Sequence, residues 1–222
     1  MRILITAGGT EEPVDGVRRL TNLSTGATGN FLARHFAERG AEVLLLHAEK
    51  ALTSKAPIER QTFVTFADLE AALRRNLGGR RWDAVVHLAA VSDYSVASIE
   101  VDGRIFPADG HGKIGSDREV VIRLRPNPKL IDSFRKWSLN ADMLVVGFKL
   151  TDDADPSSRE AHVRRLLDRG TTDLVVHNDL HDITGESHRA TIFDRRGPLV
   201  RTETKEELAK ELFRLMKDGG SR

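Results

Sequence analysis

A short run of glycine and hydroxyl residues, Ser24–Leu32 (STGATGNFL), has the composition of a phosphate-binding turn. Gly26 and Gly29 would let a ligand approach the backbone closely. Ser24 and Thr25 add hydroxyl groups, and a helix that begins directly afterwards would add free N–H groups and the positive end of its dipole. These residue types favour an anionic ligand, although a plain turn with a helix cap would use the same glycines.

A second glycine turn, Ala7–Thr10, directly follows the first apolar run. In a dinucleotide-binding fold one glycine turn joins the first strand to the first helix, but here the polar segment 11–23 separates two such turns. The single tyrosine, Tyr94, is not followed by a lysine four residues later, and His47 stands where a ribose-binding acid is expected. An NAD(P)-dependent reductase is therefore the weaker alternative.

The composition limits the class of protein. The chain has 222 residues, of which 40% are apolar and 30% charged, with a net charge of +1 and no cysteine. The balanced charge gives no general basic field for nucleic acid, and disulfide and thiolate chemistry are excluded. The N-terminus does not resemble a signal peptide, and no apolar run approaches the roughly 20 residues of a membrane span. We expect one cytoplasmic domain, residues 1–222, with no nucleic-acid or membrane partner.

Short apolar runs alternate with helical patterns along the chain. The runs typical of buried parallel strands are Ile3–Thr6, Val43–His47, Ala84–Leu88, Met143–Phe148 and Leu174–His177. The helical patterns cover residues 29–39, 67–77, 128–137, 157–169 and 204–217. This alternation predicts a doubly wound, Rossmann-like α/β fold with a mostly parallel sheet.

Residues 99–125 interrupt the alternation. They contain an Asp-Gly turn signal and a two-residue alternation in Glu119–Arg125, which predict a β-ribbon or flap. A glycine-rich loop at Gly110–Ser116 would lie within it, and such a loop either closes over a ligand or is a plain surface turn. Residues 190–200 predict a late hairpin that turns near Arg196 and Gly197.

Six ordered segments resemble the phosphopantothenoylcysteine synthetase family, the phosphopantothenate–cysteine ligases of coenzyme A synthesis. They are residues 5–29, 85–94 (VVHLAAVSDY), 113–116 (KIGS), 127–131 (NPKLI), 146–150 (VGFKL) and 173–180 (DLVVHNDL). The resemblance spans nearly the whole chain and looks most like the stand-alone bacterial form. It implies a Rossmann-like fold and a homodimer with active sites near the interface.

The resemblance also implies a two-step ligation. The carboxylate of phosphopantothenate would attack the α-phosphate of a nucleotide, CTP in most bacteria, and release pyrophosphate. The cysteine amine would then displace CMP and form an amide. Mg²⁺ would arrive on the nucleotide phosphates, and the residues leave the choice between CTP and ATP open.

Roles for single residues follow from the resemblance alone. Asn22 would bind the carbonyl of the acyl-nucleotide, and Lys113 would neutralise the triphosphate or the transition state. The substrate-binding residues would be Arg18, Gly26, Ala89 and Ala90. The nucleotide-binding residues would be Gly8, Gly9, Thr10, Ser24, Thr25, Asp93, Phe148, Arg165, Arg169 and Asn178.

Each role has an ordinary alternative. Lys113 would otherwise be a surface lysine, and Phe148 a core residue. Asp93 would hold the ribose or a metal, or else cap a helix. Arg165 and Arg169 lie four residues apart on one helix face, where they would bind the triphosphate or form a solvated basic stripe.

Four further points concern single residues and the class of protein. Spacing to Asn22 favours Arg18 over Arg19 as the phosphate ligand. Fused relatives in the family carry further lysines after this one, where this chain has Gly115 and Ser116, a difference that stand-alone relatives tolerate. Three histidines, His177, His181 and His188, invite a zinc hypothesis, but we expect no protein-held metal there. A non-catalytic nucleotide-binding regulator is the third functional hypothesis.

Overall fold

The computed structural model describes residues 1–108, 112–115, 117–152, 155–182 and 188–219. An eight-stranded sheet runs in the order β13-β12-β11-β10-β6-β1-β4-β5. Its strands are β1 (Arg2–Ala7), β4 (Glu42–Ala48), β5 (Glu59–Phe63), β6 (Ala84–His87), β10 (Leu144–Thr151), β11 (Leu174–Asp179), β12 (Ala190–Asp194) and β13 (Gly197–Thr202). The strands from β5 to β11 pair in parallel, and β12 and β13 pair antiparallel. The predicted α/β class with a mostly parallel sheet is confirmed.

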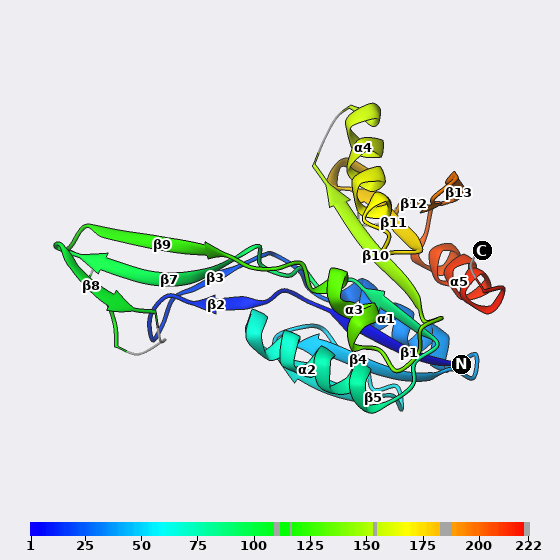
Figure 1. Ribbon diagram of the computed structural model, residues 1–222, viewed down its shortest axis with the longest axis horizontal. Coiled ribbons are helices and arrows are strands. Elements are labelled where there is room, and N and C mark those ends of the chain that lie inside the picture. The colour runs from blue at the N-terminus through cyan, green and yellow to red at the C-terminus, as the bar shows by residue number, and fades with distance from the viewer. Residues whose placement is uncertain (109–111, 116, 153–154, 183–187, 220–222) are drawn as a thin grey trace.

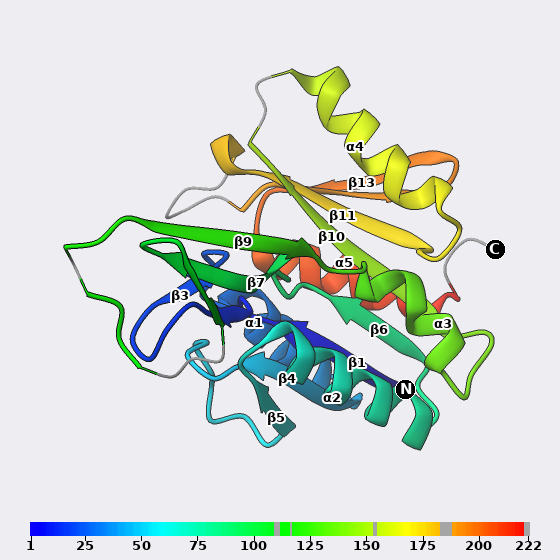
Figure 2. The same cartoon turned by 60° about the vertical axis from the view of Figure 1, so that its left-hand side comes forward.

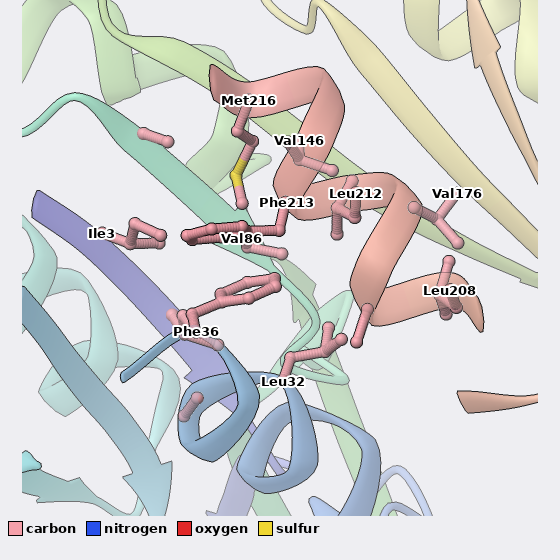
Figure 3. Close-up of a cluster of buried hydrophobic side chains, with 14 of the residues drawn as sticks. Ile3, Leu32, Phe36, Val86, Val146, Val176, Leu208, Leu212, Phe213 and Met216 are labelled. Atoms are coloured by element: carbon pink, nitrogen blue, oxygen red, sulfur yellow. The ribbon is translucent and has the colours of Figure 1, made fainter. Parts of the chain in front are cut away.

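Helices cover both faces of the sheet (Figure 1). They are α1 (Ala27–Ala37), α2 (Phe66–Gly79), α3 (Phe134–Trp137), α4 (Pro156–Asp168) and α5 (Lys205–Lys217), with 3₁₀ turns η1 (Leu130–Ser133) and η2 (Leu180–Asp182). On one face α1 and α5 enclose a core in which the rings of Phe36 and Phe213 stack at 5.4 Å (Figure 3). On the other face α2, η1 and α3 bury residues that include Leu73 and Phe134. The alternating side chains of the central strands thus serve two cores.

The strand order reverses between β1 and β6. From β1 the chain passes outward to β4 and β5, and then returns through β6 to β10 and β11 on the other side. The loops that leave β1 and β6 lie together, because Thr10 N donates to Ala90 O at 3.3 Å and Ala90 N donates to Gly8 O at 2.9 Å. In open α/β sheets such a reversal is where ligands bind.

An arm extends from the carboxyl end of the sheet (Figures 1 and 2). Its strands are β2 (Glu11–Pro13), β3 (Arg19–Thr21), β7 (Tyr94–Val101), β8 (Arg104–Pro107) and β9 (Val120–Pro126). β2 pairs with β3, and β7 pairs antiparallel with both β8 and β9. A small core of Val14, Ile99 and Val101, with Ile114 against it, joins the two parts of the arm. The predicted ribbon is present, but part of its predicted glycine-rich loop, at Gly110 and Ser116, lies outside the described residues.

The segment 128–137 and three short strands differ from the sequence prediction. Residues 128–137 form η1 and the single turn α3 instead of one helix. Three residues per 3₁₀ turn align Ile131 with Phe134, and both are buried under the sheet. β5 was missed because its sequence, ERQTF, is not an apolar run, and β2 and β3 were missed because each has three residues.

Candidate active site

A cleft of about 690 Å³ lies where β1, β6 and β10 end. Its walls come from the two glycine-containing segments near Gly8 and Gly26, from the loop after β6, and from Phe148 on β10. The first residues of α1 also line it, so the free N–H groups of that helix end face the same space. The cleft therefore occupies the reversal point of the sheet.

Two glycines let the backbone close around this cleft. Gly26 is the N-cap of α1 with φ +70°, a conformation that favours glycine, and a Cβ there would lie 2.8 Å from the Cβ of Ala51. A Cβ on Gly9 would lie 2.3 Å from the carbonyl oxygen of Asn22. The two turns seen in the sequence therefore pack directly against each other across the segment 11–23.

Most of the residues predicted to bind ligands line the cleft. They are Gly8, Asn22, Ser24, Thr25, Gly26, Ala89, Ala90, Asp93, Phe148, Arg165, Arg169 and Asn178. Phe148 also packs against the core of the α1 face, so it has the core contact that its ordinary alternative requires. Asp93 precedes β7 and does not cap a helix.

Four predicted residues lie outside the cleft lining, namely Gly9, Thr10, Arg18 and Lys113. Thr10 is fully buried behind the cleft, where its hydroxyl accepts a 2.9 Å hydrogen bond from Ser92 N. It thus shapes the loop that follows β6. Arg18 and Lys113 belong to the arm, and the Lys113 residue is exposed.

The Asn22 side chain is held at the cleft edge. Its Nδ2 donates to the carbonyl oxygen of Val91 at 3.2 Å, and the residue is otherwise exposed. An amide in this position can offer a neutral hydrogen bond to a ligand oxygen.

The electrostatic character of the cleft is cationic. Besides Arg165 and Arg169, three lysines line it that were not predicted, Lys129, Lys149 and Lys205. Asp93 is the one carboxylate in the described lining, and it forms an ion pair with Lys129. Arginine and lysine side chains around a helix N-terminus suit a ligand with several negative charges.

Arg165 and Arg169 both reach the cleft from the end of α4. Arg169 forms an ion pair with Asp132 of η1 at 3.1 Å, so one of the two is already oriented by a carboxylate. Asn178, on β11, is buried and donates to Arg189 O at 3.1 Å. These contacts place the basic pair and the amide on the side of the cleft formed by β10 and β11.

His87 is a cleft residue that the sequence analysis missed. Its Nδ1 lies 2.8 Å from the hydroxyl of buried Thr6, and that oxygen also accepts from Ala89 N at 3.1 Å. Because the Thr6 proton has no other acceptor among the described residues, it is donated to Nδ1, and Nε2 carries the ring proton. Withdrawal of the ring from solvent lowers the pKa of His87 to about 4. His87 is therefore neutral at physiological pH.

Asp15 is a second missed residue, located in the arm. Hydrogen bonds from backbone N–H groups, first that of Val17, lower the pKa of its carboxyl to about 2. The neighbouring arginines face different groups. Arg19 donates to the carbonyl oxygens of Asp15 and Arg18, whereas Arg18 donates to the Asp15 carboxylate and to Ile114 O. Arg18 is thus the one directed toward the Lys113 loop.

Two of the three histidines near the end of β11 are linked, because the Thr151 hydroxyl beside His177 donates to the carboxylate of Asp179 beside His181. His177 Nε2 lies 2.8 Å from the Thr151 hydroxyl, and His181 Nδ1 lies 2.7 Å from the carboxylate of Asp179. His188 lines the cleft. Among the residues that the structure describes, no group of three or more histidine, cysteine or acidic side chains could hold a metal ion.

The geometry can be compared with known proteins. The family described as DNA/pantothenate metabolism flavoprotein C-terminal domain matches residues 1–218. The coenzyme A biosynthesis bifunctional protein CoaBC of Thermococcus kodakarensis is 33% identical over 217 residues, which cover 96% of this chain and 50% of the relative. The CoaBC protein of Escherichia coli K12 is 27% identical with the same two coverages. The chain thus spans about half the length of the curated relatives that it matches.

Solved structures share the fold. The DNA/pantothenate metabolism flavoprotein from Streptococcus pneumoniae superposes with a TM-score of 0.87 at 27% identity, covering 98% of this chain and 99% of that one. A Cab2 H337A variant in complex with phosphopantothenate-cysteine has a TM-score of 0.74 at 22% identity, covering 98% and 87%. Among the described residues no helix has the length and apolar character of a membrane span. The match over residues 1–218 confirms the resemblance seen in the motifs, and the chain belongs to the family of DNA/pantothenate metabolism flavoprotein C-terminal domains.

Proposed function

We propose that this chain is a phosphopantothenate–cysteine ligase of coenzyme A synthesis. The observation that carries the proposal is the cationic cleft at the reversal point of the sheet, which joins Asn22, the start of α1 and the basic pair Arg165 and Arg169. The family match and the bifunctional coenzyme A biosynthesis relatives support it.

In the first step the carboxylate oxygen of phosphopantothenate attacks the α-phosphorus of CTP. A P–O bond to the acyl group forms, the bond to the β-phosphate oxygen breaks, and pyrophosphate leaves. Negative charge develops on the phosphate oxygens, and cations placed beside them stabilise it. Arg165 and Arg169 would take the triphosphate, and Lys113 the charge of the transition state.

In the second step the cysteine amine attacks the acyl carbonyl. The C–O bond to the nucleotide breaks, CMP leaves, and the amine loses a proton as the amide forms. The Asn22 amide, oriented by Val91 O, would donate to the acyl oxygen as it becomes negative.

CTP is proposed on the strength of the motif resemblance, with ATP as the competing nucleotide. Mg²⁺ would neutralise the triphosphate and the leaving pyrophosphate. The residues fit a metal brought by the substrate, because the described lining contains one carboxylate, Asp93, which Lys129 neutralises.

We also propose that the chain forms a homodimer through its arm. Apolar side chains are exposed on it, including Ile105 at 67%, Phe106 at 48% and Val121 at 45%. Exposed apolar patches on a short ribbon are typical of interfaces. A second copy is the occupant that would also bring a second Lys113 loop near a cleft. Sedimentation velocity should report a dimer for the wild type and a monomer for Ile105→Lys combined with Phe106→Lys.

The activity test mixes the protein with phosphopantothenate, Mg²⁺ and either CTP or ATP, with and without cysteine. Pyrophosphate release and an amide product that requires cysteine would support the ligase and identify the nucleotide. Nucleotide binding without pyrophosphate release from folded protein would favour the regulator. Tight NADPH binding without CTP binding would favour the reductase.

A further inference from the structure

We propose that Asp15 is a positioning residue of the ligase, which fixes the Lys113 loop and the Arg18 side chain as one unit. This inference rests on the proposed function and extends it to a residue outside the cleft. Asp15 lies at the turn between β2 and β3, and its side chain is 2% exposed. Arg18 and Lys113 are two of the four predicted site residues outside the cleft lining, and both belong to the segments that Asp15 contacts.

One carboxylate oxygen shapes the turn. Oδ1 accepts hydrogen bonds from Val17 N at 2.9 Å and from Arg18 N at 2.7 Å. Asp15 N and Val14 N also donate to Arg18 O, at 3.4 and 3.0 Å, so the turn is closed from both sides. The Arg18 backbone therefore has a single position relative to β2.

The other carboxylate oxygen binds the lysine loop. Oδ2 accepts from Ile114 N at 3.1 Å and from Arg18 Nη1 at 2.7 Å. The Arg18 guanidinium also donates to Ile114 O, with Nη2 at 3.3 Å. On the other side of Lys113, the carbonyl oxygen of Gly112 accepts from Gly16 N at 2.7 Å. Both neighbours of Lys113 are thus attached to the β2–β3 turn.

A carboxylate suits this position better than an amide. Four donors converge on its two oxygens, and each oxygen receives two of them. The side chain of Ile114 packs into the small core of the arm beside Val14, which prevents the loop from sliding along the turn. The depressed pKa of Asp15 follows from the same contacts and keeps it ionised at physiological pH. Arg18 keeps 45% of its side chain exposed and remains available to a phosphate.

The consequence is a fixed relation between the Arg18 guanidinium and the backbone on both sides of Lys113. Arg18 is predicted to take the phosphate of phosphopantothenate, and Lys113 the charge of the nucleotide. Fixing them together would align the two ends of the first reaction, in which small displacements of a reactant are costly. Cysteine enters only in the second step and should not depend on this alignment.

The variant Asp15→Asn tests whether Asp15 positions the Lys113 loop or only supports the fold. The amide keeps one acceptor oxygen, but its NH₂ group faces two donors whichever way it turns. We expect kcat/KM for phosphopantothenate in pyrophosphate release to fall by about tenfold or more, while KM for cysteine stays at the wild-type value. Asp102→Asn is the matched control, because it removes an exposed ion pair to Arg118 in the same arm without touching the Lys113 loop.

A second measurement does not depend on activity. Hydrogen exchange should show slow exchange of the Ile114 amide in the wild type, faster exchange in Asp15→Asn, and no change in Asp102→Asn. Wild-type kinetics in Asp15→Asn, or a fast-exchanging Ile114 amide in the wild type, would overturn the inference. Equal losses for all three substrates would also overturn it, since they indicate general damage. A wild type without ligase activity would instead refute the proposed function, and the exchange result would still test the contact.

Discussion

Asn22 is the residue whose geometry most directly suggests a role in amide formation. Its amide is held by Val91 O at the edge of the cleft, so it needs no reorientation when a ligand binds. We expect Asn22→Asp to permit pyrophosphate release but to slow cysteine transfer about 10²-fold, because a neutral donor is replaced by a carboxylate that repels a developing oxyanion. Quenched-flow assays should show the acyl-nucleotide accumulating.

The control for that variant is Asn30→Asp. Asn30 lies in the first turn of α1, which follows the Asn22 segment, outside the cleft lining, and its side chain accepts from Ser54 N at 2.9 Å. Normal cysteine transfer in Asn22→Asp, or an equal defect in Asn30→Asp, would remove Asn22 from the mechanism.

His87 leads to a prediction about stability and pH. Its folded pKa of about 4 lies below the unfolded value of about 6.5, so the unfolded chain binds the proton more readily. The contribution of His87 is fully present above pH 6.5 and is lost as the pH falls toward 4. From pH 7 to pH 5, the free energy of unfolding should fall by about 1–2 kcal/mol more in the wild type than in His87→Gln.

Denaturant titrations of the wild type and His87→Gln at pH 7 and pH 5 measure this difference in the free energy of unfolding. The tautomer of His87 can be measured separately by NMR. Nitrogen chemical shifts of His87 should report a protonated Nε2 and an unprotonated Nδ1, because Thr6 donates to Nδ1. A Thr6→Val variant should remove that preference. A protonated Nδ1 in the wild type would contradict the assigned hydrogen bond.

At the residue scale the sequence predicted location well, because most of the residues predicted to bind ligands line the cleft. Glycines and hydroxyl residues of a phosphate-binding turn can be recognised from their type and spacing, and Ser24, Thr25 and Gly26 do line the cleft. Lys129 and Lys205 carry no such pattern and reach the cleft because the fold places η1 and the start of α5 at the same edge. Asp15 was missed because its partner Ile114 is 99 residues away in the chain, and no local pattern marks their contact.

The end of helix α4 gives a prediction at the scale of elements. Arg165 and Arg169 face the cleft, and only Arg169 of the two has an ion pair among those recorded for the described residues. We expect Arg165→Ala to raise KM for the nucleotide about tenfold with little change in KM for cysteine, because a cation that faces a triphosphate is lost. Arg164→Ala is the matched control, since Arg164 pairs with Glu160 on the same helix and lies outside the lining.

Steady-state kinetics at two salt concentrations provide the measurement. The wild-type KM for the nucleotide should rise with salt more steeply than that of Arg165→Ala, because one screened attraction is missing. Equal KM values for Arg165→Ala and Arg164→Ala would support the alternative of a solvated basic stripe.

Elements were predictable where a local pattern decides their structure. Continuous apolar runs gave the central strands, and the helical pattern over residues 204–217 gave α5, where the Thr204 hydroxyl caps the helix by accepting from Glu207 N. β5 was not predicted because it is a half-exposed edge strand without an apolar run. Residues 128–137 were misjudged because burial of Phe134 beneath the sheet, a long-range contact, favours the tighter 3₁₀ turn.

At the scale of the whole molecule, two predicted site residues lie on the arm and not in the cleft. Lys113 and Arg18 lie on the arm, outside the lining of the cleft in the same chain, and the arm exposes apolar side chains. We expect the arm of one protomer to complete the cleft of the other in the proposed dimer. Isologous contacts of this kind give two equivalent shared sites.

Mixing two inactive variants tests that arrangement. In a mixed dimer of Asn22→Ala and Lys113→Gln, one cleft has both defects and the other has an intact Asn22 with an intact Lys113 from the partner. Random exchange makes half of the dimers mixed, so turnover should recover to about a quarter of the wild-type value per chain. If Lys113 acts in the cleft of its own chain, every site keeps one defect and the mixture stays inactive. Adding Ile105→Lys and Phe106→Lys to both variants should abolish recovery, because the shared site requires the arm interface.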